Sequence, residues 1–161
     1  MTIKVGDKLP EATFYTVNED GPVAVTTAEF FSGKKIVVIG LPGAFTPTCH
    51  NNHLPGFVEN AEAIKGKGVD TIAVLAANDA FVMDAWVGVS GAEGKIVPLS
   101  DPDAAFSDSI GLSIDMSARG LGMRAQRFTL VVEDGVVSAV NAGDHPGQVV
   151  ESSAEKILET L

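Results

Sequence analysis

Cysteine occurs only once in this 161-residue chain, at Cys49. A single thiol cannot form a disulfide within the chain, which fits a reducing compartment. It also excludes the Cys-x-x-Cys motif of dithiol oxidoreductases, because the position three residues before the cysteine is Thr46. Any redox chemistry of this chain must therefore use one sulfur.

Positive charge and long apolar runs are also scarce. Eleven lysines and arginines stand against 21 aspartates and glutamates, for a net charge of −10. This balance argues against nucleic acid or an anionic membrane as a partner. No apolar stretch approaches the length of a membrane span, and residues 1–7 lack the apolar core of a signal peptide. We therefore expect a cytoplasmic protein.

The remaining composition is that of one globular domain. Apolar residues make up 45% of the chain and charged residues 20%, so residues 1–161 can bury a full hydrophobic core. Apolar periodicity and turn residues predict the elements in chain order. They are strands 12–17 and 23–25, a short helix 28–31, a strand 36–39, a helix ending near residue 65, a strand 71–76, a helix 81–89, a strand 95–99, a short helix from residue 102, an irregular stretch 112–123, strands 127–133 and 136–141, and a final helix.

Three local signals refine this pattern. Asp134-Gly135 is a strong two-residue hairpin signal between two apolar runs. Pro55 should kink the helix in which it lies, because proline removes one backbone hydrogen bond. Ser152 with Glu155 forms a capping box for the last helix. The order βαβαβ, hairpin, helix predicts an α/β thioredoxin-like fold, with a mixed central sheet, helices on both faces and an N-terminal β-hairpin.

Cys49 lies where a buried strand gives way to a helix. The apolar run 36–39 ends at Leu41-Pro42-Gly43, and helical periodicity begins soon after the cysteine. The first turn of a helix presents unpaired N–H groups and the positive end of the helix dipole, so it favours a thiolate, the reactive form of cysteine. Thr46 or Thr48 can cap this helix, and the Thr46 hydroxyl lies one turn before the sulfur. The arrangement predicts a nucleophile.

These residues also form a family motif. Pro42, Thr46 and Cys49 match the Pro-x-x-x-Thr-x-x-Cys motif of the peroxiredoxins, and the chain resembles their atypical type II subgroup over nearly its whole length. Further segments that resemble the subgroup are residues 53–57, 78–83 and 120–128. The resemblance implies a thiol peroxidase that reduces hydrogen peroxide and alkyl hydroperoxides and serves antioxidant defence and redox homeostasis.

The resemblance also implies roles for individual residues. Cys49 attacks the hydroperoxide and becomes a sulfenic acid, Thr46 and an arginine donate hydrogen bonds to the peroxide oxygens, and Pro42 shields the sulfenic acid. Arg124 is the best match for that arginine, because it stands three residues before Arg127-Phe128, where a strand begins. Arg119 and Arg127 are the weaker candidates.

Many type II members carry a second, resolving cysteine, and this chain has none. The resemblance is therefore to the one-cysteine variant, whose sulfenic acid is reduced by an outside thiol. Glutathione with glutaredoxin is favoured over thioredoxin, because a small thiol can enter the pocket. The subgroup also suggests a homodimer. We expect no cofactor and no metal.

Other functions of Cys49 remain open at this point. Cys49 and His53 lie one helical turn apart and could hold a zinc ion, but two ligands on one helix make a weak site. A cysteine hydrolase would pair the thiol with a histidine such as His145, yet no oxyanion site is evident. A non-catalytic thioredoxin-fold module, such as a redox sensor, would oxidise only slowly.

Overall fold

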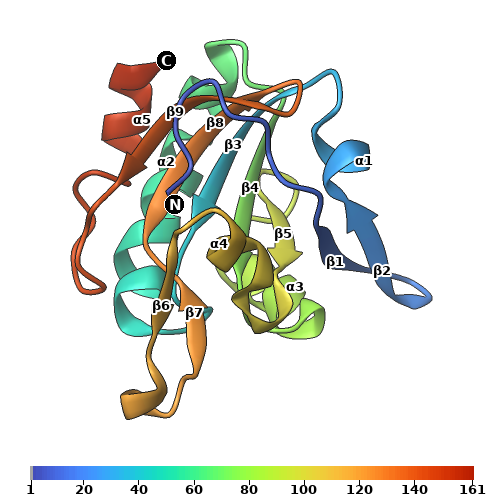
Figure 1. Cartoon of the computed structure of the whole chain (residues 1–161), viewed down its shortest axis with the longest axis vertical. Coiled ribbons are helices and arrows are strands. Elements are labelled where there is room, and N and C mark those ends of the chain that lie inside the picture. The colour runs from blue at the N-terminus through green and yellow to red at the C-terminus, as the bar shows by residue number, and fades with distance from the viewer. Residues whose placement is uncertain (1) are drawn as a thin grey trace.

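The computed structural model describes residues 2–161 and confirms the predicted architecture. A seven-stranded mixed sheet has the order β2-β1-β5-β4-β3-β8-β9, and a separate two-stranded sheet pairs β6 with β7. The strands are β1 (Thr13–Asn18), β2 (Gly21–Thr26), β3 (Lys35–Gly40), β4 (Thr71–Ala76), β5 (Val97–Ser100), β6 (Ser113–Asp115), β7 (Met123–Ala125), β8 (Phe128–Glu133) and β9 (Val136–Ala142). The hairpin β1–β2 lies at one edge of the large sheet (Figure 1).

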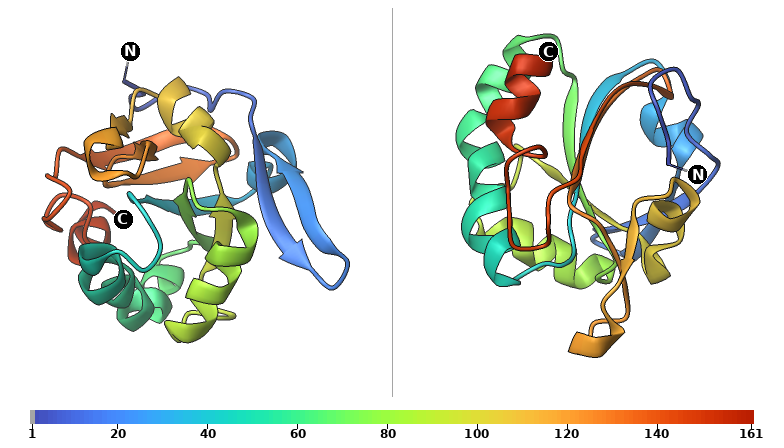
Figure 2. Two further views of the ribbon diagram at one scale, coloured as in Figure 1. Left: turned by 90° about the horizontal axis from the view of Figure 1, so that it is seen from below. Right: turned by 60° about the vertical axis from the view of Figure 1, so that its left-hand side comes forward.

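Helices cover both faces of the large sheet, as Figure 2 shows. The helices are α1 (Thr27–Phe31), α2 (Leu54–Gly66), α3 (Ala80–Val89), α4 (Ala105–Ser109) and α5 (Ala154–Thr160). Apolar side chains of α2, α3 and α5 pack on one face, and those of α1 and α4 pack on the other. No helix of the described chain is long and apolar enough to cross a membrane.

The centre of the sheet carries the segment that leads to Cys49. Strand β3 runs parallel to β4 and antiparallel to β8. Its residues from Ile36 to Ile39 are at most 1% exposed, which agrees with the continuous β-branched run expected of a strand covered on both faces. Gly40 ends the strand against the Phe128 ring, where an added Cβ would lie 2.2 Å from ring atoms. Only glycine permits this contact between β3 and β8.

Of three local predictions, the hairpin turn is confirmed, and the Pro55 kink and the cap of the last helix differ in detail. Asp134 and Gly135 both have positive φ (49° and 78°), as the predicted hairpin turn requires. Pro55 lies in the first turn of α2, preceded by a π-helical turn, so the irregularity comes before the proline. This follows because proline cannot donate the bond that a regular helix would need there. Ser153, and not Ser152, caps α5 by accepting a hydrogen bond from the Lys156 N–H.

The stretch 112–123 was predicted to be irregular, but it contains β6 and leads into β7. Each of these strands has only three residues, which is too short for apolar alternation to be recognised. The two strands form a ribbon that extends away from the large sheet (Figure 1). This ribbon carries Arg119 and Arg124 beside the segment around Cys49.

Candidate active site

Cys49 begins a π-helical turn, Cys49–His53, that continues directly into α2. The thiol side chain is 1% exposed. Neither threonine caps this turn as predicted: Thr48, at the N-cap position, makes no side-chain capping bond, and the Thr46 hydroxyl donates to the Gly43 carbonyl at 2.6 Å. The loop before the turn includes Phe45 in the left-handed region, with φ 62°. Such a conformation is costly for a non-glycine residue and often accompanies a functional site.

A cavity of about 230 Å³ opens beside this turn. Loops from four parts of the chain meet here: the segment after β3, the β6–β7 ribbon, the start of β8 and the loop after β9. Its lining residues are Pro42, Thr46, Pro47, Thr48, Met116, Arg119, Leu121, Arg127, Pro146 and Gly147. Pro42 and Thr46 thus line one cavity, together with Pro146 and Gly147 from the loop after β9. In the sequence, only His145 had connected that loop with Cys49.

Arg127 is the arginine that contacts the sulfur. Its Nη2 donates to the Cys49 Sγ at 3.3 Å and to the Pro146 carbonyl, and its Nη1 lies 2.9 Å from the His53 Nδ1. The side chain is 2% exposed. Its Nε is buried and has no hydrogen-bond partner among the described residues.

Arg124, which the sequence favoured, occupies a neighbouring position. Its Nε donates to the Leu121 carbonyl at 2.8 Å and its Nη1 to the Pro42 carbonyl at 3.1 Å. None of the hydrogen bonds of the described residues joins Arg124 to the sulfur. The arginine beside the sulfur is therefore Arg127, one of the two weaker candidates from the sequence, and Arg124 ties the ribbon to the Pro42 segment. Spacing along the chain could not show this, because Arg124 lies in β7 and Arg127 immediately precedes β8, only three residues later.

His53 is a buried neutral base beside Arg127. Its ring is 1% exposed, and burial lowers its pKa from 6.5 to about 4, although a hydrogen bond to the Ser152 carbonyl acts in the opposite direction. The neutral ring donates from Nε2 to that carbonyl at 2.9 Å, so its Nδ1 accepts from Arg127. In the sequence, the four-residue spacing between Cys49 and His53 suggested only a possible zinc ligand. It did not indicate the contact of His53 with Arg127.

The groups around Cys49 bear on its alternative roles as a zinc ligand and as a hydrolase nucleophile. No group of three or more potential metal-binding side chains occurs among residues 2–161, so a zinc site based on Cys49 and His53 lacks further ligands. His145 is exposed, and no described hydrogen bond joins it to the thiol. A hydrolase needs a basic nitrogen on the sulfur, whereas the group found there is a guanidinium, which cannot accept the proton.

The charges around the cavity contrast with those of the whole chain. The chain has only three arginines, and all three lie at this place: Arg119 and Arg127 line the cavity, and Arg124 bonds to Pro42. None of the described ion pairs includes an arginine. A locally positive site in a protein of net charge −10 favours a thiolate and attracts small anions.

The chain is similar to known proteins along nearly its whole length. The Redoxin family model matches residues 4–158. The chain is 45% identical to peroxiredoxin-2E-2, chloroplastic, of Oryza sativa subsp. japonica over 165 residues, covering 99% of this chain and 73% of that protein. It is 40% identical to peroxiredoxin-2C of the same plant, covering 99% and 98%.

A solved structure is also similar along the whole chain. The crystal structure of reduced Prx3 in complex with H2O2 from Vibrio vulnificus has a TM-score of 0.93 and 42% identity, covering 99% of each chain. The match extends over the large sheet and its helices, so the fold is thioredoxin-like. Together with the family model and the plant relatives, it shows that the chain belongs to the peroxiredoxins of the type II subfamily, as a thiol peroxidase with a single cysteine.

Proposed function

We propose that Cys49 reduces hydrogen peroxide and alkyl hydroperoxides through a sulfenic acid. The thiolate attacks one peroxide oxygen, the O–O bond breaks, and the other oxygen leaves as water or an alcohol after taking up a proton. The observation that carries this proposal is the contact between the Arg127 guanidinium and the Cys49 sulfur at 3.3 Å. A fixed cation favours the anionic nucleophile, and its N–H donors that have no described partner suit a peroxide oxygen.

Stabilising the thiolate cannot by itself produce a fast peroxidase. An ordinary thiol with a pKa near ~8.5 is about 3% ionised at pH 7. Complete ionisation therefore gains about thirtyfold in rate, or ~2 kcal/mol, and part of that gain is lost because nucleophilicity falls with pKa. A larger acceleration requires donors aimed at the breaking O–O bond.

Two donors and a shield are available around the sulfur. Arg127 has the free buried Nε, and the Thr46 hydroxyl lies on the cavity wall, where its present acceptor is the Gly43 carbonyl. Pro42 is buried on the same wall and excludes water from the sulfenic acid. Arg124 holds Pro42 through its carbonyl and so acts as a positioning residue.

A thiol from outside the chain closes the cycle, and glutathione is favoured over a thioredoxin. The sulfenic acid condenses with glutathione to give a mixed disulfide and water, and a second glutathione or a glutaredoxin thiolate then attacks that disulfide and releases Cys49. The buried sulfur favours a small thiol over a protein one. The exposed Arg119 guanidinium on the cavity wall, which belongs to none of the ion pairs of residues 2–161, suits a carboxylate of glutathione.

Intact-mass measurement tests both the peroxide and the glutathione steps. One equivalent of peroxide followed by glutathione should give one glutathione adduct per chain, which glutaredoxin removes. Peroxide alone in excess should give the sulfinic acid. A covalent dimer as the main product, or reduction by thioredoxin but not by glutathione, would contradict the proposed cycle.

We also propose that the protein is a homodimer that acts in antioxidant defence within a reducing compartment such as the cytoplasm. Phe45 and Phe81 are exposed by 50% and 59%, and such large apolar groups at a surface suit a second copy. Of the two plant relatives, one is named as chloroplastic and the other carries no compartment in its name. Light scattering across a concentration series measures the assembly, and a constant monomer mass would exclude the dimer.

A further inference from the structure

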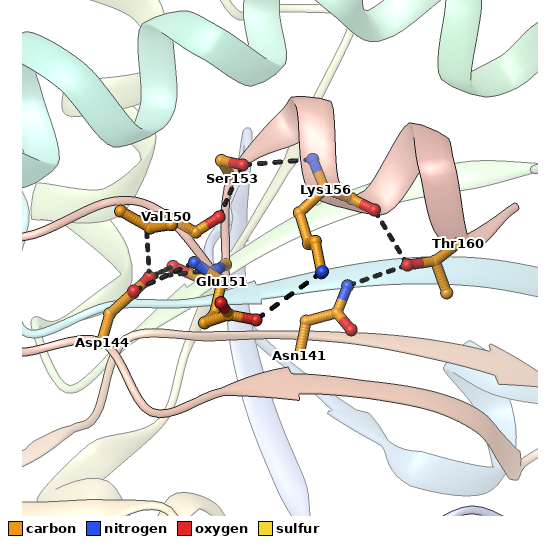
Figure 3. Close-up of polar contacts among 8 residues, drawn as sticks. Asn141, Asp144, Val150, Glu151, Ser153, Lys156 and Thr160 are labelled. Atoms are coloured by element: carbon orange, nitrogen blue, oxygen red, sulfur yellow. Dashed lines mark hydrogen bonds and ion pairs between the residues drawn. The ribbon is translucent and has the colours of Figure 1, made fainter.

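The loop that follows β9 is closed by one carboxylate. Asp144 accepts hydrogen bonds from the N–H groups of Val150, Glu151 and Ser152 at 3.0 to 3.1 Å, and from the Ser152 hydroxyl at 2.6 Å. Figure 3 shows the Asp144 carboxylate facing this stretch of main chain, just before the first turn of α5. Residues 144–152 therefore form a closed loop, called here the Asp144 clasp.

Two main-chain carbonyls of the clasp bond to the site around Cys49. The Ser152 carbonyl accepts from the His53 Nε2 at 2.9 Å and from the Thr129 hydroxyl at 2.7 Å. The Pro146 carbonyl accepts from the Arg127 Nη2. Ser152 is bonded to Asp144 directly through its N–H and its hydroxyl, and Pro146 lies between the two ends of the loop that Asp144 closes. The carboxylate therefore restricts where both acceptors can lie.

The contacts continue from these carbonyls to the sulfur. His53, fixed by the Ser152 carbonyl, accepts from the Arg127 Nη1 at 2.9 Å, and Arg127 donates to the Cys49 Sγ at 3.3 Å. The two ends of the guanidinium are thus set by acceptors that both depend on the clasp. Pro146 also lines the cavity, so the same loop forms one wall of the space that a peroxide enters.

We propose that Asp144 is a positioning residue for peroxide reduction, because its carboxylate closes the loop whose carbonyls align Arg127 with Cys49. Asp144 has no described hydrogen bond to Arg127 or Cys49 and acts only through the loop. The inference rests on the proposed function, in which Arg127 assists the attack of Cys49 on peroxide. A reacting group displaced by about 1 Å can lose about a hundredfold in rate, so the clasp should matter for catalysis.

The decisive variant is Asp144→Asn, with Asp144→Glu as the conservative variant. An amide has one oxygen in place of two, and its NH2 group would face N–H donors, so it cannot accept all four hydrogen bonds. We expect the second-order rate of Cys49 with H2O2 to fall at least about tenfold. Glutamate keeps both oxygens and should recover part of that rate. The matched control is Glu151→Gln in the same loop. The exposed Glu151 carboxylate has one ion pair among the described residues, with Lys156 at 3.9 Å, so this change should leave the rate as in the wild type.

A second measurement separates positioning from loss of folding. Alkylation of Cys49 by iodoacetamide does not need a guanidinium aligned with an O–O bond. In Asp144→Asn the alkylation rate at a fixed pH should therefore be retained or increased while the peroxide rate falls, because the loop is open. Circular dichroism gives the folded fraction to which both rates are normalised.

The possible outcomes distinguish this inference from the proposed function. A wild-type peroxide rate in folded Asp144→Asn, with the Cys49→Ser variant inactive, overturns the role of Asp144 and leaves the peroxidase assignment standing. Equal loss in Asp144→Asn and Glu151→Gln overturns it as well, since the effect would then belong to loop charge. Peroxidase activity that survives in Cys49→Ser removes the proposed function itself. A selective loss in Asp144→Asn that glutamate partly restores supports the clasp.

Discussion

The buried neutral state of His53 predicts that mild acid destabilises the protein. In the folded chain the pKa of His53 is about 4, compared with an ordinary value of 6.5. As the pH falls through 6.5 the unfolded chain takes up a proton that the folded chain refuses until about pH 4. The contribution of the neutral ring is therefore fully present above about pH 7 and is lost progressively on acidification.

The size of the effect follows from the two pKa values. Linkage gives a loss of about 2 kcal/mol between pH 7.5 and pH 5, and about 3 kcal/mol once the pH lies below 4. Domains of this kind are usually stable by only about 5 to 15 kcal/mol, so the change is readily measured. The charges of Arg127 and Asp144 also act on the ring. A guanidinium cannot be deprotonated in a protein. Burial raises the pKa of Asp144, but hydrogen bonds from Ser152, Glu151 and Val150 outweigh burial and hold that pKa below its ordinary value.

Denaturant unfolding at pH 7.5 and pH 5 measures this loss, and His53→Gln is the variant that tests its source. Glutamine can still offer one donor and one acceptor, but it does not titrate. It should be less stable than the wild type at pH 7.5, and its further loss on moving to pH 5 should be smaller by about 2 kcal/mol. The control is His145→Gln, because His145 is exposed and its replacement should leave the wild-type pH dependence. If His53→Gln loses as much stability as the wild type between the two pH values, the ring is not the buried neutral base described here.

The remaining predictions concern the reacting groups and are measured by stopped-flow peroxide kinetics. Cys49→Ser should abolish turnover with an unchanged circular dichroism spectrum, since no other thiol exists. Thr46→Val should slow the peroxide reaction about tenfold or more while Thr46→Ser is tolerated, because only the hydroxyl is needed. Arg127→Met should cost about a hundredfold or more. Arg124→Met should cost less, because its bonds go to main-chain carbonyls; a larger loss at Arg124 than at Arg127 would reverse the assignment drawn from the structure.

The fold was predictable because strong local signals agreed with each other. The β-branched run 36–39 and the Asp134-Gly135 turn each specify one structure, and both appear as expected. The short strands β6 and β7 were not predictable, because three residues cannot show a period. The shift of the last helix cap from Ser152 to Ser153 has a different cause: the Ser152 hydroxyl is bonded to Asp144, eight residues earlier in the chain.

The loop that brings Pro42 and Thr46 close to Cys49 was predictable, and the contact of an arginine with the sulfur was not. Pro42, Thr46 and Cys49 are set by local chain geometry, since a broken strand followed by a helix places them within one loop. The contact of Arg127 with Cys49 joins residues 78 positions apart, and it depends on the pairing of β3 with β8, which sets the start of β8 beside the end of β3. A difference of three residues between Arg124 and Arg127 decides which side chain meets the sulfur, and single-sequence patterns do not resolve strand boundaries that finely.

The partners of Arg127 explain how a buried cation can favour a thiolate. Buried charges are usually paired, and a carboxylate beside the guanidinium would neutralise its field. Here the described partners other than the thiol are neutral: the His53 ring and the Pro146 carbonyl. The Asp144 carboxylate has no described hydrogen bond to Arg127 and is bonded instead to the loop that supplies these acceptors. Neutral dipoles satisfy two of the N–H groups without cancelling the charge, so the buried arginine obtains a counterion among its described contacts only when Cys49 ionises.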